Sequence, residues 1–211
     1  MAVALVCGGG GALGGAIVDT LLARGDTVVV ADLHGSDRTD VLSEAVDLTQ
    51  PEAVEALWDR LEEQPRWVVN AVGGFRSGTV AETEPDAVRF AWDLNLGTAW
   101  WSCRAAAKRL GRDGAIVNVS SRTALVGGAN AAAYAVAKAA VVKLTEVLAQ
   151  EADVRVNAVL PSVIDTPANR ASLSAAALER AVPPQRIADV IAFLLSDAAG
   201  AVSGAIVPVY G

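Results

Sequence analysis

The sequence predicts a single α/β domain in which a doubly wound, mostly parallel sheet carries helices on both faces. Short Val-rich apolar runs alternate with segments of helical spacing along the whole chain. The length of 211 residues suffices for one such domain with a sizeable core and is too short for a comfortable second one. No repeat, low-complexity tract or linker divides the chain, so we expect residues 1–211 to form one domain.

The expected strands are short, rich in valine and bounded by Gly, Asp or Pro. Apolar runs without polar alternation are typical of strands that are buried on both faces of a parallel sheet. The first run starts at residues 1–6, which lack the basic segment of a signal peptide and are expected to enter a strand. The expected strands are Ala2–Cys7, Thr27–Ala31, Trp67–Ala71, Ala115–Val119, Val154–Leu160 and Ala205–Val209.

The segments between these strands have the apolar spacing of helices. Pro51 and Pro85 stand where a first-turn proline is favoured, because its missing amide would have no partner there. Leu33–Val46 has few apolar residues and no helical pattern, so we expect a loop. Pro167–Pro183 is Ala-rich and predicts one small helix over the carboxyl edge of the sheet, where such folds bind ligands. The expected helices are Ala12–Ala23, Pro51–Glu62, Pro85–Leu110, Ala131–Glu151 and Pro184–Leu195.

Composition and charge disfavour several classes of partner. The net charge is −7 and Lys and Arg form no cluster, which argues against nucleic acid and against an anionic membrane. No uninterrupted apolar stretch reaches the roughly 18 residues of a membrane span. The two cysteines, Cys7 and Cys103, have no metal-binding spacing and lie far in sequence from the single histidine, His34. We therefore expect no metal site and a reduced, cytoplasmic setting.

A glycine-rich turn joins the first expected strand to the first helix. Residues Gly9 to Gly14 fit G-x-G-x-x-G, a pattern that gains weight between a strand and a helix. Glycines let backbone N–H groups approach a pyrophosphate at the positive end of the helix. Asp32 lies 18 residues after Gly14, at a position where a carboxylate accepts hydrogen bonds from the adenosine ribose and repels a 2′-phosphate. The turn predicts an NAD(H) site; NADP(H), with Arg38 as the nearest cation, and a plain flexible turn are the alternatives.

Tyr134 and Lys138 lie four residues apart on an expected helix, which puts the phenol and the ammonium on one face. A nearby cation favours the phenolate and lowers the pKa of a tyrosine from about 10 toward neutrality. Tyr134 would then be a usable general acid and base. The alternative is an incidental pair on a surface helix.

With these motifs in place, the chain resembles the short-chain dehydrogenase/reductase family over essentially its whole length. Cys7-Gly8-x-x-x-Ala12-x-Gly14 is similar to the family's T-G-x-x-x-[AG]-x-G, and Ser121 precedes Tyr134 by the family's 13 residues. The family has a Rossmann-type sheet of about seven strands. Further matching segments are Asp47-Leu48, Asn70-Ala71-Val72-Gly73, Asn95 within Asp93–Gly97, and Arg155–Pro161 followed by Ile164-Asp165-Thr166-Pro167.

The resemblance implies hydride transfer between NAD(H) and a carbonyl compound or secondary alcohol. Ser121 would hold the substrate oxygen and Tyr134 would protonate it. Lys138 would bind the nicotinamide ribose and lower the Tyr134 pKa, and Asn95 would keep a water that links Lys138 to solvent. The residues implied at the cofactor are Gly8, Gly10, Gly11, Ala12, Leu13, Gly14, Asp32, Leu33, Asp47, Leu48, Asn70, Ala71, Val72, Gly73, Tyr134, Lys138, Pro161, Ser162, Ile164 and Thr166.

The chain also departs from the family's pattern. Cys7 stands where a threonine usually ties the glycine turn down, and Ser162 stands for a common glycine. The chain is shorter than a typical member, and the missing length falls in Leu33–Val46 and in the lid region Pro167–Pro183. We therefore expect a more open substrate end.

Three tryptophans, Trp92, Trp100 and Trp101, lie on one long expected helix and could suggest an aromatic binding site. The resemblance implies instead that this helix and Ala131–Glu151 form a subunit interface, so we expect packing residues and a homodimer or homotetramer. His34 is expected to be an exposed loop residue beside the adenine site.

Two other functions stay open. One is a non-catalytic, nucleotide-sensing protein of the same fold, against which the set of Asn95, Ser121, Tyr134 and Lys138 argues. The other is a different reaction at the same site, such as epimerisation or dehydration with bound NAD, or dehalogenation. Asp32 and the glycine turn disfavour a dehalogenase, because that type lacks a cofactor.

Overall fold

The computed structural model describes residues 2–211 and has one seven-stranded parallel sheet in the order β3-β2-β1-β4-β5-β6-β7. The order reverses between β1 and β4, and ligands of such sheets bind beyond the carboxyl ends of the strands at this switch point. Met1, the first residue of the expected strand region 1–6, lies outside the described residues. The strands are β1 (Val3–Cys7), β2 (Thr27–Asp32), β3 (Leu42–Ala45), β4 (Trp67–Asn70), β5 (Ala115–Val119), β6 (Arg155–Pro161) and β7 (Ile206–Val209).

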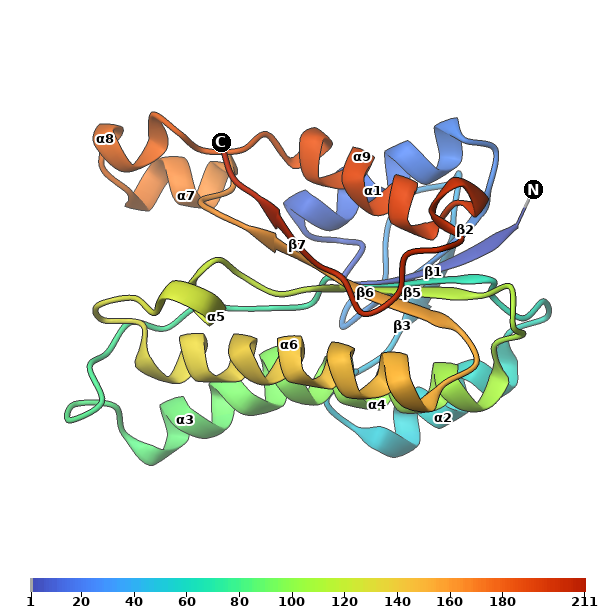
Figure 1. The fold of residues 1–211 in the computed structure, drawn as a ribbon, viewed down its shortest axis with the longest axis horizontal. Coiled ribbons are helices and arrows are strands. Elements are labelled where there is room, and N and C mark those ends of the chain that lie inside the picture. Colours follow the sequence, from blue (N-terminus) through green and yellow to red (C-terminus); the bar gives the residue numbers. More distant parts are fainter. Residues whose placement is uncertain (1) are drawn as a thin grey trace.

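Helices cover both faces of the sheet and confirm the expected α/β class (Figure 1). On one face lie α1 (Ala12–Ala23) and α9 (Pro184–Leu195), and on the other lie α2 (Pro51–Arg60), α4 (Thr98–Arg109) and α6 (Ala132–Glu151). Neighbouring strand residues serve opposite cores, because side chains alternate along a strand. Val30 packs with α1, whereas Val29 packs with α2. Within residues 2–211, every helix is too short or too polar to cross a bilayer.

The segment expected to be a loop, Leu33–Val46, contains the edge strand β3. This strand pairs only with β2, and three of its four residues are exposed. An edge strand with one solvent face needs no buried apolar run, so its sequence carries no strong signal. Residues 33–41 form no helix, as expected.

The expected long helix Pro85–Leu110 consists of three consecutive parts. α3 (Pro85–Ala91) runs into a π-helical segment, η1 (Trp92–Gly97), which continues as α4. A π-helical turn carries an extra residue and is common at functional sites, but apolar spacing does not reveal it. The segment holds Asn95, one of the expected site residues.

Short helices frame the carboxyl edge. The lid region expected to hold one helix holds two, α7 (Pro167–Ser172) and α8 (Ala175–Leu178), which lie beyond the end of β6 (Figure 1). A further single turn, α5 (Thr123–Val126), follows β5 and was not expected. A 3₁₀ turn, η2 (Asp197–Ala199), follows α9.

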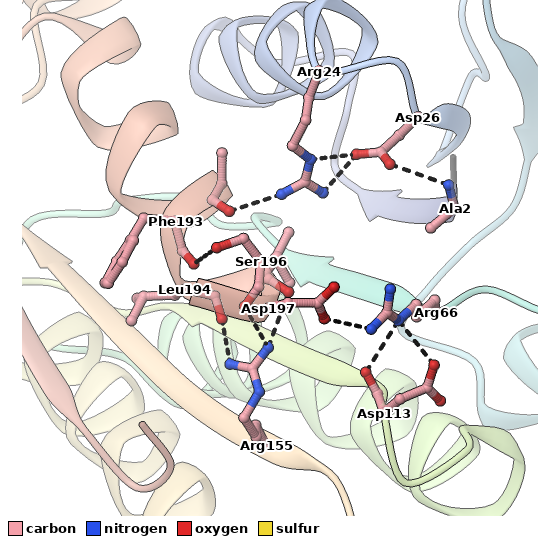
Figure 2. Close-up of polar contacts among 12 residues, drawn as sticks. Ala2, Arg24, Asp26, Arg66, Asp113, Arg155, Phe193, Leu194, Ser196 and Asp197 are labelled. Carbon is pink, nitrogen blue, oxygen red and sulfur yellow. Dashed lines mark hydrogen bonds and ion pairs between the residues drawn. The ribbon is translucent and has the colours of Figure 1, made fainter. Parts of the chain in front are cut away.

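The opposite, amino edge of the sheet is closed by arginines (Figure 2). Arg155 starts β6 and donates to the carbonyl oxygens of Leu194, Leu195 and Ser196 at 2.5, 2.9 and 3.1 Å. These carbonyls end α9 and would otherwise have no helical partner. Arg66 pairs with Asp113 and Asp197 on neighbouring turns. These contacts tie the start of β6 and the turn before β4 to the end of α9, to η2 and to the turn before β5.

Candidate active site

A cleft of about 780 Å³ opens at the carboxyl ends of β1, β2 and β4. Its volume is in the range of small-molecule and cofactor sites. Residues expected at the cofactor make up one part of its lining, namely Gly8, Gly10, Gly11, Asp32, Leu33, Asp47, Leu48, Ala71, Val72 and Gly73. The rest of the lining was not expected at the cofactor, except for His34 beside the adenine site. It is formed by His34, Gly35, Val46, Thr49, Phe90, Asp93, Leu94 and Thr98.

Main-chain bonds hold the glycine turn against the strand ends. Gly8 has φ +86°, and a Cβ at this residue would lie 2.8 Å from the Val72 nitrogen. Gly10 N donates to Asp32 Oδ2 at 3.0 Å, so the turn is bound to the end of β2. The N-cap of α1, Gly11, offers no side-chain acceptor to the first-turn amides. These free amides fit an anionic pyrophosphate.

The charges along the cleft are negative. Asp32, Asp47 and Asp93 line it, and no Lys or Arg of the described residues does. Arg38, the nearest cation in the sequence, is bound instead to Asp19 at 2.6 Å and to Asp40 at 2.8 Å. A 2′-phosphate in the cleft would meet like charges without a compensating cation.

Two of the four residues expected to carry catalysis, Asn95 and Lys138, meet at Gly73. A Cβ at Gly73 would lie 2.9 Å from Asn95 Oδ1 and 3.2 Å from Lys138 Nζ, so a larger residue there would displace these side chains. Lys138 Nζ lies 6.0 Å from the centroid of the Tyr134 ring and donates to the Val119 carbonyl at 2.9 Å. Tyr134 also interacts with the side chain of Ser121.

The prediction that Lys138 lowers the Tyr134 pKa is wrong for this structure. Burial raises the pKa of Tyr134, and the hydrogen bond with Ser121 opposes only part of that shift. Burial also lowers the pKa of Lys138, to about 8. Spacing on a helix shows that two groups are close, but desolvation disfavours the charged form of each. Tyr134 is therefore a protonated phenol at neutral pH.

Two residues that the motifs did not name contact the candidate catalytic groups. Thr123 Oγ1 lies 3.0 Å from Ser121 Oγ, and the Thr123 amide also donates to that oxygen at 3.3 Å. The Phe75 ring meets the Tyr134 ring edge-on, with centroids 5.3 Å apart, although Phe75 is 59% exposed. Both residues lie on turns that follow the ends of strands. This position is the only feature of the sequence that could have indicated them.

Asn95 is engaged by the loop after β4. Its Nδ2 donates to the carbonyls of Gly74 at 2.9 Å and Ala91 at 3.1 Å, and its Oδ1 accepts from the Gly74 amide at 3.2 Å. The wide turn of η1 thus fixes this loop beside Lys138. Whether a water joins Asn95 to Lys138 stays a prediction.

Asn70 is not part of the cleft lining, although we expected it at the cofactor. It is buried, and its Nδ2 donates to Asn118 Oδ1 at 2.8 Å. Asn118 in turn donates to Thr145 Oγ1 at 2.9 Å. In this structure, Asn70 ties β4 to β5 and α6.

Other expected cofactor residues lie around the main cleft rather than in its lining. Pro161 and Ser162 line a neighbouring pocket together with Ser121, and the Ser162 hydroxyl is buried without a hydrogen-bond partner. Thr166 caps α7 by accepting from the Asn169 amide at 3.2 Å, which leaves its hydroxyl hydrogen free to donate. The remaining expected residues outside this lining are Ala12, Leu13, Gly14, Tyr134, Lys138 and Ile164.

The tryptophans and cysteines do not line the cleft. Trp92 and Trp100 are 49% and 47% exposed, whereas Trp101 packs against the core. Cys7 and Cys103 are free and buried, and burial raises the pKa values of these thiols to about 11 and about 12. His34 is exposed, as expected.

Comparisons with known proteins agree with the geometry. A family model described as enoyl-(acyl carrier protein) reductase matches residues 10–211. The cis-4-hydroxycyclohexanecarboxylate dehydrogenase of Sinomonas cyclohexanicum is 34% identical over 99% of this chain and 95% of its own length. The galactitol 2-dehydrogenase of Rhizobium johnstonii is 33% identical, with 98% and 92% covered. The ligand-free aldohexose dehydrogenase of Thermoplasma acidophilum superposes with a TM-score of 0.91 at 27% identity, covering 99% and 92% of the two chains.

Proposed function

The chain belongs to the short-chain dehydrogenase/reductase family of oxidoreductases, and within it we propose that the protein transfers hydride between NAD(H) and a small carbonyl compound or secondary alcohol. One observation carries the proposal. A Ser121–Tyr134–Lys138 group, in which Ser121 and Lys138 are buried and Tyr134 is partly buried, adjoins a cleft lined by carboxylates and, among the described residues, by no arginine or lysine. The first feature supports catalysis and the second supports NAD(H) over NADP(H).

The residues that would hold the cofactor fit its parts. The free amides of the glycine turn and of α1 suit the pyrophosphate. Asp32 keeps acceptor capacity beyond its bonds to Gly10 and Leu33 and suits the adenosine ribose. Lys138 suits the nicotinamide ribose. When bound, NADH supplies the hydride for the reduction.

The side chains would manage the substrate oxygen. Ser121, oriented by Thr123, would donate a hydrogen bond to the carbonyl oxygen. Tyr134 would give that oxygen its proton while the carbonyl carbon gains the hydride, so the carbonyl becomes a hydroxyl group. A phenol whose pKa is raised by burial is in the protonated form that this step requires. The oxidation runs through the same groups in reverse.

A nucleotide sensor has no need for Ser121, Tyr134 and a buried lysine at one point, so we give the catalytic proposal precedence over it. We also propose that the protein is a homodimer or homotetramer through the consecutive helices α3, η1 and α4 and through α6. Trp92 on η1 and Trp100 on α4 are exposed on this surface. Two free thiols support a reducing, cytoplasmic compartment.

The test measures the turnover of NADH with a panel of small ketones and aldehydes. The absorbance of the reduced cofactor reports the reaction. We expect carbonyl-dependent oxidation of NADH. Binding of NADH without turnover of any panel member would favour the nucleotide-sensing function instead.

A further inference from the structure

A second pocket adjoins Ser121 and differs from the main cleft in the sign of its charge. It measures about 330 Å³ and lies between the turn after β5 and the end of β6. No acidic residue of the described chain lines it, although the whole chain has a net charge of −7. Its single charged lining residue is Arg122, which directly follows Ser121. The pocket is lined by Ser121, Arg122, Thr123, Val126, Gly127, Pro161, Ser162 and Val163.

Arg122 is held in place without a carboxylate. Its amide donates to the Pro161 carbonyl at 2.9 Å, and its guanidinium carbon lies 5.2 Å from the centroid of the Tyr210 ring. Most other arginines of the described chain, Arg38 and Arg170 among them, are bound to aspartate or glutamate. A guanidinium that contacts an aromatic ring instead of a carboxylate keeps its N–H donors free, and their planar fork matches a carboxylate.

We infer that Arg122 binds an anionic group of the substrate, so that the substrate is a keto acid or the corresponding hydroxy acid. This inference rests on the proposed function, because it places the substrate oxygen at Ser121 and Tyr134. Ser121 and Arg122 line the same pocket, so the carbonyl and the carboxylate of one substrate would both lie there. Val126 lines the same pocket and is 65% exposed, which suits an apolar spacer.

The test compares each acid with its own methyl ester. The probes are 3-oxobutanoate, 4-oxopentanoate and 5-oxohexanoate with their esters, and the measured quantity is the acid-to-ester ratio of kcat/KM. We expect one acid to exceed its ester by about tenfold or more, the usual size of a charge-assisted hydrogen bond. Arg122→Met should bring this ratio close to one, and Arg122→Lys should keep part of it, because the charge stays and the fork is lost.

The matched control is Arg112→Met, which removes the same charge at the opposite edge of the sheet. Arg112 is exposed and forms only a 3.4 Å pair with the exposed Asp153. This variant should keep the wild-type ratio. A change of the ratio in both variants would assign the effect to net charge and overturn the inference.

Three further outcomes are decisive. If wild type prefers every ester, or if Arg122→Met keeps the acid preference, Arg122 does not bind the anionic group of the substrate. If Arg122→Met changes the molar mass in light scattering, Arg122 belongs to a subunit contact instead. If no ketone is turned over, the proposed function fails, but the anion site can still be tested. Calorimetry then compares the binding of the three acids to wild type and to Arg122→Met. Equal binding to both proteins, or no binding to either, overturns the inference.

Discussion

Replacing Lys138 by methionine should make the protein more stable and much less active. Lys138 is 4% exposed, and burial lowers its pKa from 10.5 to about 8. At about 1.36 kcal/mol per pKa unit, holding the ammonium charged at pH 7 costs about 3 kcal/mol. Methionine has a similar length and no charge, but it leaves the Val119 carbonyl without its donor, a loss of about 1–2 kcal/mol.

The expected gain in the free energy of unfolding is therefore about 1–2 kcal/mol at pH 7, or roughly 3–6 °C in Tm for a chain of this size. The pH dependence has a definite direction. Between about pH 8 and the pKa of 10.5, the unfolded chain binds more protons than the folded one, so wild-type stability rises with pH. The advantage of Lys138→Met should shrink across this window.

Chemical denaturation of the cofactor-free protein at pH 7 and at pH 9.5 measures both effects, and NADH turnover gives the activity. Lys143→Met is the control on the same helix, because Lys143 is exposed and ion-paired with Glu146. It should change neither stability nor activity appreciably. A Lys138→Met protein that is less stable than wild type at pH 7 would refute the desolvation argument.

Four other predictions concern the site and the assembly. Tyr134→Phe should lower kcat by about 10²–10⁴-fold while the Kd for NADH stays nearly unchanged, since the lost hydroxyl is the proton donor; more than a tenth of wild-type kcat would point to another acid. With the reduction at saturating substrate, kcat should fall only at a pH above the range in which an ordinary tyrosine titrates, because burial raises the Tyr134 pKa and the proposed step uses the protonated form. Steady-state kcat/KM should favour NADH over NADPH by about tenfold or more, which a preference for NADPH would contradict. Light scattering should give a multiple of 21.6 kDa, and a monomer at micromolar concentration would exclude the proposed interface.

The helices and strands with clear local sequence patterns could be predicted from the sequence. α1, α9 and β5 have the predicted bounds, because glycine and proline mark their ends and their apolar pattern is clear. The edge strand β3 and the π-helical segment η1 were missed, since neither depends on an apolar period. Their formation is decided by pairing with β2 and by the packing of Asn95.

Within the site, the motifs named the groups but not their surroundings. Tyr134 and Lys138 were named from their spacing and Ser121 from the resemblance to the family, whereas Thr123 and Phe75 make contacts that only the fold creates. The direction of the Tyr134 pKa shift was mispredicted for the same reason. Burial is a property of the packed chain, and the i, i+4 spacing contains no information about it.

The two free edges of the sheet bear on how copies of the chain associate. An open strand edge can add a strand from another molecule and start aggregation. β3 is short, and its Glu44 forms an ion pair with Arg60 at 2.9 Å. At the other edge, β7 contains Pro208, which has no amide to offer a further strand. Both edges therefore resist continuous β-sheet growth, which leaves the helical faces as the surfaces for ordered self-association.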